Sequence, residues 1–290
     1  MSKPSFTSIL QKNFDLDQLI RHALKEDISS GDHTSLSTIP SHAVNSASLI
    51  IKEDGILAGV ELAKKIFSFL DKNLKVSIHK RDGAKIKKGD IAFTVKGSAR
   101  SILTAERVVL NCMQRMCGIA TMTHKYVSLC KPNKTKVLDT RKTSPGLRAI
   151  EKWAVRIGGG HNHRFGLYDM ILIKNNHIDF SGGIPSAIKA ANNYLKRKKL
   201  KLLIEIEARN IKEVRQIMSV GKVDRILLDN FSISEIKKAV KLINGRFQTE
   251  ISGGVNEKNI RQYASCGADY ISSGALTHSV KSLDMSLTAV

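Results

Sequence analysis

The stretch LLIEIEARNIKEVRQIMSVGKVDRILLDN, residues 202–230, carries the main fold signal. It holds two short apolar runs, LLIEIEAR and RILLDN, with the helix-length segment IKEVRQIMSV between them. Near-continuous apolar strands that alternate with helices are typical of a parallel sheet covered on its faces. The stretch therefore predicts one strand–helix–strand unit of a parallel sheet.

The same pattern extends outward from this stretch in both directions. The other apolar runs that end in polar or charged residues are KVLDTRK (136–142), MILIKNN (170–176), QTEISGG (248–254) and DYISSGA (269–275). A second predicted helix, ISEIKKAVKLI, lies at 233–243. This repetition predicts an α/β barrel of parallel strands, closed or open, over residues 119–276.

The preceding part of the chain, residues 1–118, mixes helical and strand signals. DLDQLIRHALKED (15–27) has the apolar spacing of an amphipathic helix, and SASLIIKEDGILAGVE (46–61) predicts two strands around Asp54-Gly55. Two further turns are expected at Asp82-Gly83 and Gly89-Asp90. Together they predict a smaller N-terminal α+β domain, after which TAERVVLNCMQRMCGIATMTH (104–124) forms a long helix leading into the barrel.

Composition narrows the class of ligand. Lys and Arg total 47 against 26 Asp and Glu, a formal net charge of +21 in 290 residues, so anionic ligands are expected. A nucleic-acid binder stays open on charge alone, although aromatic residues make up only 5% and none are interleaved with Arg. No apolar stretch resembles a signal peptide or a membrane span, which predicts a cytoplasmic protein with no membrane partner. The four cysteines are expected to be reduced.

The residues that follow the predicted strands are the candidate site, because the active site of a β/α barrel lies at the carboxyl ends of its strands. In chain order they are Arg141, Lys142, Lys174, Glu207, Asp229, Ser252-Gly253-Gly254 and Ser273-Gly274. Several cations around one pocket would repel each other without an anionic occupant, so a multiply anionic substrate is expected. The Ser/Gly turns can cradle a phosphate. Glu207 and Asp229 suit Mg²⁺ or sugar hydroxyls.

Some features have simpler explanations. Gly158-Gly159-Gly160 can be a flexible loop, and the run KRKKLK at 196–201 can be a solvated helix end. His161-x-His163 resembles a zinc-binding spacing, but no third His, Cys or carboxylate follows or precedes it at a spacing typical of zinc sites. Glu205 precedes Glu207 by two residues, and we assign it to the opposite face of its strand.

Several blocks together resemble the quinolinate phosphoribosyltransferase family, also called nicotinate-nucleotide pyrophosphorylase (carboxylating). They are DTRKTSPGLR (139–148), GGGHNHRFGLYDMILIKNNHI (158–178), ILLDN (226–230), SGGV (252–255) and SSGALTHS (272–279), with weaker matches upstream. The resemblance implies a small α/β sandwich (residues 1–118, with the tail 277–290 returning to it) joined to an open α/β barrel. It also implies transfer of phosphoribose from 5-phosphoribosyl-1-pyrophosphate to quinolinate, with loss of CO₂, in a cytoplasmic homodimer.

The resemblance also implies roles for individual residues. Quinolinate would be bound by Arg141, His163, Arg164 and Lys174, joined by Arg107 of the neighbouring subunit. Phosphoribosyl pyrophosphate would be bound by Lys142, Glu207, Asp229, Ser252, Gly253, Gly254, Ser273, Gly274 and His278. Mg²⁺ would be held by Glu207 and Asp229.

One position departs from the family pattern. The family usually has Asp or Glu directly after the lysine of LIK, where this chain has Asn175, which brings no charge, so weaker binding of Mg²⁺ is expected. Two alternatives stay open: a molybdenum-gene-associated relative that uses another acceptor, and a non-enzymatic binder of anions or nucleic acid. Activity with quinolinate itself separates the first from the family's reaction, and steeply salt-dependent DNA binding marks the second.

Overall fold

The computed structural model describes residues 15–290, which form two compact units. The first contains residues 15–124, 144–159 and 279–290, and the second contains residues 125–143 and 160–278. The division expected from the sequence differs from these bounds, since it fell at residue 118 and gave residues 144–159 to the barrel. Helix α5 (Ala99–Cys130) continues without interruption through residue 118, so no local break in the chain marks the change of unit.

The first unit is built on an antiparallel sheet of four strands in the order β12-β1-β5-β3, with a separate pair, β2 and β4. Its elements are α2 (Leu16–Ile28), α3 (His33–Thr38), β1 (Val44–Ile51), β2 (Gly55–Ile56), α4 (Val60–Leu70), β3 (Lys75–Ile78), β4 (Lys85–Ile86), β5 (Ile91–Ser98), most of α5, α6 (Arg148–Ile157) and β12 (Met285–Ala289). The two strands expected around Asp54-Gly55 are present, but β2 pairs with β4 because β1 is already paired on both sides.

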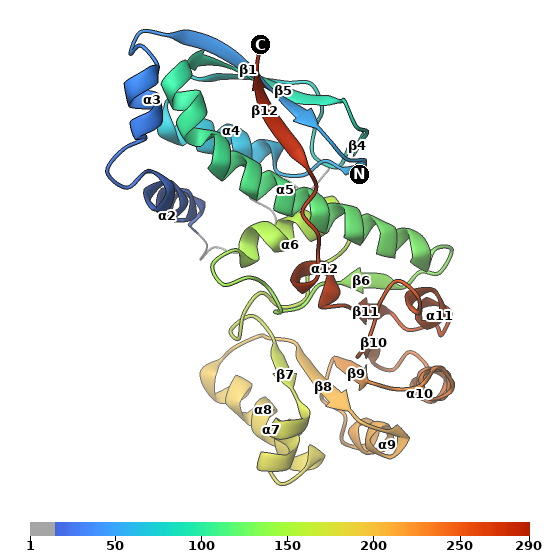
Figure 1. Ribbon diagram of the computed structural model, residues 1–290. Helices are drawn as coiled ribbons and strands as arrows, with labels where there is room; N and C mark the ends of the chain where they lie inside the picture. The colour runs from blue at the N-terminus through green and yellow to red at the C-terminus, as the bar shows by residue number, and fades with distance from the viewer. Residues whose placement is uncertain (1–14) are drawn as a thin grey trace. The chain divides into compact units, whose positions relative to one another are not determined.

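The C-terminal strand belongs to this first sheet. β12 pairs antiparallel with β1, with Ala289 opposite Ala47 and Met285 opposite Ile51, as the red and blue strands show in Figure 1. Met285 is buried with Leu49 and Ile51, so the tail completes one side of this core.

The second unit is a parallel sheet of six strands in the order β6-β11-β10-β9-β8-β7. Its elements are β6 (Lys136–Leu138), β7 (Ile171–Ile173), α7 (Asn175–Phe180), α8 (Ile184–Lys198), β8 (Ile204–Ala208), α9 (Ile211–Val220), β9 (Arg225–Asp229), α10 (Ile233–Ile243), β10 (Gln248–Ser252), α11 (Ile260–Ala264), β11 (Tyr270–Ser272) and α12 (Ala275–His278). Every strand predicted from the apolar runs is present. β6 and β7 are not paired with each other among the described residues, so the barrel is open, as expected.

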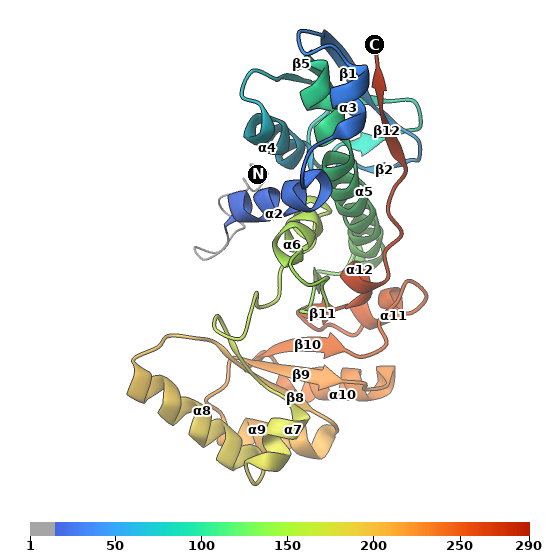
Figure 2. The same ribbon diagram turned by 60° about the vertical axis from the view of Figure 1, so that its left-hand side comes forward.

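Local sequence explains how the strands and helices of this unit alternate. The strand interiors are apolar and buried, with Ile206, Leu228 and Ile251 at most 1% exposed. Helices α9 and α10 begin at polar capping residues. The Asn210 side chain accepts a hydrogen bond from the Glu213 amide at the start of α9, and Ser232 forms a capping box with Glu235 at the start of α10. Figure 2 shows β8, β9 and β10 side by side with their helices. The carboxyl ends of the parallel strands therefore meet at one edge of the sheet.

No helix among residues 15–290 is both long enough and apolar enough to cross a membrane.

Candidate active site

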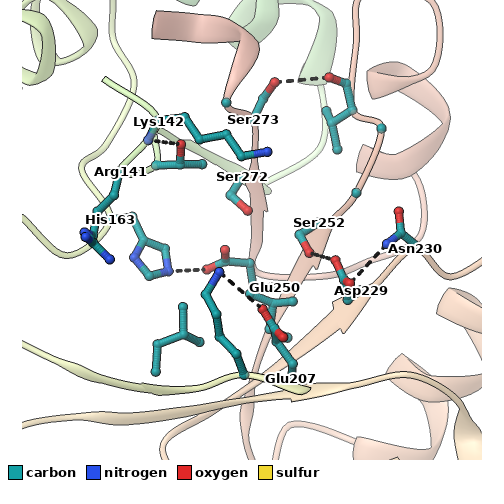
Figure 3. Close-up of a pocket in the computed structure, with 18 of the residues that line it drawn as sticks. Arg141, Lys142, His163, Glu207, Asp229, Asn230, Glu250, Ser252, Ser272 and Ser273 are labelled. Atoms are coloured by element: carbon teal, nitrogen blue, oxygen red, sulfur yellow. Dashed lines mark hydrogen bonds and ion pairs between the residues drawn. The ribbon is translucent and has the colours of Figure 1, made fainter. Parts of the chain in front are cut away.

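A cavity of about 980 Å³ opens at the carboxyl ends of the strands in the second unit. The described residues that line it include almost all the predicted site residues: Arg141, Lys142, His163, Arg164, Lys174, Glu207, Asp229, Ser252, Gly253, Gly254, Ser273, Gly274 and His278. Figure 3 shows the labelled side chains around this space, which come from β8, β9, β10 and β11 and from the segment that follows β6. Arg107 instead lies on α5 in the first unit, where it is exposed.

The rim of the cavity carries cations with few protein partners. Among residues 15–290, the side chains of Arg141 and Lys142 make no hydrogen bond or ion pair, and Lys174 Nζ lies 3.9 Å from Glu207 Oε1. Burial, and then the nearby Arg141 guanidinium, lower the pKa of Arg164 below its ordinary value. Crowded cations of this kind raise the affinity of the site for an anion.

Two carboxylates lie among these cations. Glu207 Oε2 accepts a hydrogen bond of 2.9 Å from the Asn175 amide at the start of α7. Asp229, at the end of β9, accepts a hydrogen bond of 2.7 Å from Ser252 Oγ and another of 3.0 Å from Asn230 Nδ2. These contacts hold both carboxylates as acceptors for hydroxyl groups or a cation.

The turn after β10 requires glycine. Gly253 has φ of 93°, and a Cβ at this position would overlap the Asn230 side chain. The amides of Gly253, Gly254 and Gly274 donate no hydrogen bond to any acceptor within residues 15–290. Ser252 Oγ donates to Asp229 and Ser273 Oγ donates to the Val255 carbonyl at 3.1 Å, so the serines hold the turns and the glycine amides stay available for an anion.

The floor of the cavity is a buried charged cluster. His163 Nε2 lies 2.9 Å from Glu205 Oε2. It also lies 3.5 Å from Glu250 Oε2, and Figure 3 shows these two side chains facing each other. Arg225 Nη1 lies 2.8 Å from Glu250 Oε2 and 3.8 Å from Glu205 Oε1. Burial, and then the Glu205 carboxylate, raise the pKa of Glu250 to about 7, and burial also raises the pKa of Glu205. Both acids are fully buried.

The assignment of Glu205 to the opposite strand face is wrong. Side chains alternate along a strand, so residues two apart share a face. Glu207 lines the cavity, and Glu205 contacts His163, which also lines it. The same rule identifies Glu250, which the sequence analysis missed, because it precedes the predicted site residue Ser252 by two positions on β10.

The cysteines are free thiols, as expected: Cys112, Cys117, Cys130 and Cys266 form no disulfide.

Comparison with known proteins gives a consistent result along the chain. Residues 32–117 match the model of the quinolinate phosphoribosyl transferase N-terminal domain, and residues 119–288 match that of its C-terminal domain. The chain is 47% identical over 289 residues to "Quinolinate phosphoribosyltransferase [decarboxylating] 2b, mitochondrial" of Nicotiana tabacum, covering 94% of this chain and 82% of that one. It is 42% identical over 272 residues to "Probable nicotinate-nucleotide pyrophosphorylase [carboxylating]" of Bacillus subtilis (strain 168), covering 94% and 92%.

Solved structures show the same relationship. The crystal structure of NadC from Streptococcus pyogenes aligns with a TM-score of 0.90 at 38% identity, covering 97% of this chain and 100% of that one. The nicotinate-nucleotide pyrophosphorylase of Francisella tularensis aligns with a TM-score of 0.87 at 40% identity, covering 95% and 96%. Both domains and nearly the whole length are matched, so the chain belongs to the quinolinate phosphoribosyltransferase family.

Proposed function

We propose that this protein transfers phosphoribose from 5-phosphoribosyl-1-pyrophosphate to quinolinate with decarboxylation, giving nicotinate mononucleotide, CO₂ and pyrophosphate for NAD biosynthesis. The observation that carries the proposal is one cavity in which Arg141, Arg164 and Lys174 lie with Glu207 and Asp229. A dicarboxylate matches the three cations, and the hydroxyl groups of a ribose match the two carboxylates. The molybdenum-gene-associated alternative is not favoured, because the relatives are named for quinolinate or for nicotinate nucleotide.

Quinolinate is held by the rim cations. Arg141 and Arg164 guanidinium groups offer paired N–H donors that fit carboxylates, and Lys174 adds a third positive charge. Arg141 follows β6, and Lys174 is fixed at the start of α7 by a hydrogen bond from its amide to His177 Nδ1 at 2.9 Å. Because the three cations come from different segments, they can contact two carboxylates on one ring from different sides.

The phosphoribosyl donor occupies the remaining part of the cavity. Its 5-phosphate is bound by the amides of Gly253, Gly254 and Gly274, and its ribose hydroxyls donate to Glu207 and Asp229. Lys142, whose Cδ lies close to Gly274, supplies the positive charge for the departing pyrophosphate. Positive charge develops on the ribose as the bond from C1 to pyrophosphate breaks, so nearby carboxylates stabilise the transition state.

The residues present fit a magnesium ion. Asn175 Oδ1 is buried without a hydrogen-bond donor among the described residues, and the amide of the same residue binds Glu207 Oε2. Amide and carboxylate oxygens are the ligands that Mg²⁺ prefers. Glu207, Asp229 and Asn175 would hold the ion, which when bound would neutralise negative charge on the leaving pyrophosphate.

We further propose a homodimer with shared active sites, in which Arg107 of one subunit joins Arg141 of the other. Arg107→Ala and Arg141→Ala homodimers should both be nearly inactive. Equal co-expression should give heterodimers with one intact site, so that activity recovers to roughly a quarter of wild type. A mixture that contains heterodimers but stays inactive would show that Arg107 does not act across the interface. The cytoplasmic location stays a prediction; some plant relatives are named mitochondrial or chloroplastic.

The reaction is tested directly. Purified protein is incubated with quinolinate, 5-phosphoribosyl-1-pyrophosphate and Mg²⁺, and loss of quinolinate is followed together with CO₂ release. Nicotinate, which lacks the second carboxylate, is the matched control and should be turned over far more slowly. Equal turnover of the two acids would rule out a dicarboxylate site, and salt-dependent binding of DNA without turnover would favour the anion-binding alternative.

A further inference from the structure

The amino ends of the parallel strands carry a concentration of positive charge. The segments that lead into β6, β8, β9 and β10 hold eleven Lys and Arg residues and one Asp, over residues 131–136, 196–203, 221–225 and 244–248. We call these four segments the amino-end face. The segments before β7 and β11, residues 165–170 and 265–270, add no cation and two acids, Asp169 and Asp269. Because the parallel strands are three to five residues long, the amino-end face lies about 10 to 16 Å from the cavity at their carboxyl ends.

The acids and the cations of this edge are used differently. Asp224 Oδ2 accepts a hydrogen bond of 2.7 Å from the Ile204 amide, and Asp269 Oδ2 accepts one of 2.8 Å from the Thr249 amide. The acids therefore hold the starts of the strands. Among the eleven cations of the amino-end face, Arg225 forms an ion pair, with Glu250. Within the described part of the chain, six exposed lysines make no hydrogen bond, ion pair or ring contact: Lys134, Lys196, Lys198, Lys199, Lys201 and Lys222.

The surface is also hollowed beside an aromatic ring. A cavity of about 480 Å³ lies between the amino ends of β6, β10 and β11, and its lining includes Lys134, Lys136, Gln248 and Tyr270. Lys136 Nζ lies 5.8 Å from the centre of the Tyr270 ring, which is half-buried. Cations that follow a backbone, together with an aromatic ring for a base, are the two elements with which proteins bind single-stranded nucleic acid.

The cations follow one edge of the sheet, which fits a linear polyanion better than the plane of a membrane. The strand order from β6 to β8 is β6-β11-β10-β9-β8. Neighbouring strands lie about 4.8 Å apart, so the row from Lys136 to Lys201 extends over about 19 Å. At a spacing of about 3.4 Å per nucleotide in one strand, this length covers up to about six phosphates.

We propose that the amino-end face binds single-stranded nucleic acid, with the sugar–phosphate backbone along the cations and one base in the hollow beside Tyr270. This activity is additional to the proposed phosphoribosyl transfer and does not depend on it, because no residue of the amino-end face lines the cavity at the carboxyl ends. The two activities use opposite edges of the same sheet.

Binding is measured by fluorescence anisotropy with a labelled single-stranded RNA of about 12 nucleotides, and with DNA of the same sequence. The logarithm of the association constant should fall linearly with the logarithm of KCl concentration, with a slope of about −2 to −4 for three to six phosphate contacts. Both strands should bind, because both present a phosphate backbone. If neither strand binds at about 50 mM KCl, the proposal is wrong.

Charge reversal locates the site. The double variant Lys198→Glu and Lys201→Glu should weaken RNA binding by about tenfold or more, and the control, Lys72→Glu and Lys75→Glu, by less than about twofold. The control changes the net charge by the same amount at two exposed positions of the first unit. An equal loss in both variants would show that only overall charge matters, which overturns the proposal. Both variants should keep the wild-type kcat/KM for quinolinate. If the protein has no such activity, the proposed function fails and RNA binding still decides this inference.

Two variants of Tyr270 test the place of the base. Tyr270→Leu should weaken RNA binding by about fivefold or more, whereas Tyr270→Phe, which keeps the ring, should bind like wild type. Inorganic polyphosphate has no bases, so it should bind wild type and Tyr270→Leu equally well, which also shows that the cations of this variant are intact. If Tyr270→Leu and Tyr270→Phe bind RNA equally tightly, no base occupies the hollow and the proposed arrangement is wrong.

A membrane surface is the competing partner for a row of lysines. Vesicles of phosphatidylserine and phosphatidylcholine are sedimented with wild type and with the variant Lys198→Glu and Lys201→Glu. RNA binding with weak sedimentation supports the proposal. If the vesicles bind the wild-type protein, lose it in this variant and RNA does not bind, the amino-end face is a membrane-binding surface and the proposal is overturned.

Discussion

At the rim of the cavity, Arg141 and Lys142 carry side chains with no hydrogen bond or ion pair among residues 15–290, whereas at its floor Arg225 lies 2.8 Å from the buried Glu250 carboxylate. The cations of the rim can therefore pair with an anionic ligand. The charged groups of the floor already pair with one another within the protein. A change at the rim should therefore alter binding and catalysis with little effect on folding. A change at the floor should mainly lower the free energy of unfolding.

The largest effect is expected at the floor, from Arg225→Ala. This variant leaves Glu205 and Glu250 buried without their guanidinium partner, and breaking a buried pair in this way costs about 3 to 5 kcal/mol of unfolding free energy. Urea denaturation at pH 8 measures the loss. Arg197→Ala, at an exposed position on α8, is the control and should change stability by no more than about 0.5 kcal/mol. If both variants unfold at the same urea concentration, the floor does not stabilise the fold.

At the rim, Arg141→Ala should show the opposite behaviour. Removing one charge-assisted contact should cost about 1.5 to 3 kcal/mol of transition-state stabilisation, measured as the fall in kcat/KM for quinolinate. Its urea midpoint should match that of wild type, because Arg141 has no partner to lose among the described residues. Wild-type kinetics in this variant would remove Arg141 from the site, and a large fall in stability would contradict the division between rim and floor.

The floor should also make stability depend on pH. Burial and the neighbouring Glu205 raise the pKa of Glu250 from its ordinary 4.5 to about 7, so the folded protein holds this proton more tightly than the unfolded chain. The resulting contribution to unfolding free energy is fully present below pH 4.5 and is lost as pH rises through about 7.

Glu250→Gln should therefore flatten the decline in stability between about pH 5 and pH 8, as measured by urea titration at several pH values. Glu257→Gln is the control, because the side chain of Glu257 is 52% exposed. Parallel pH curves for wild type and Glu250→Gln would show that this carboxyl does not hold a raised pKa.

The same contrast explains what the sequence could predict. Strands and rim residues are marked locally, because an apolar run ends where a polar side chain such as Lys174 or Asp229 begins. The floor depends on which strands become neighbours. Glu205, Arg225 and Glu250 are far apart in the chain and meet only because β8, β9 and β10 are adjacent in the sheet. Strand alternation would have placed both acids correctly, but the partner of each acid follows from the sheet order alone.

The bounds of the two units show a second limit to what the sequence predicts. The long helix predicted at 104–124 is part of α5, which extends to Cys130 and crosses from one unit to the other. The segment 144–159 belongs to the first unit: residues 149–155 of α6 are all buried, and Glu151 among them pairs with Arg115 of α5 at 2.9 Å. An amphipathic pattern shows that a helix buries one face, and it does not show which core covers that face.

The smallest expected effect lies between rim and floor, at Asn175. Its Oδ1 is buried beside Glu207, and a carboxylate binds a hard cation better than an amide does. Asn175→Asp should therefore lower the Mg²⁺ concentration for half-maximal rate by about two- to tenfold, with the rate at saturating Mg²⁺ nearly unchanged. Asn176→Asp is the matched control: it adds the same charge one residue away, at an exposed position that also lines the cavity. If both variants shift the Mg²⁺ response equally, the effect is one of general charge and Asn175 does not bind the ion. If Asn175→Asp leaves the response unchanged or weakens it, the metal lies elsewhere, and the carboxylates at this edge of the cavity accept hydrogen bonds from the sugar alone.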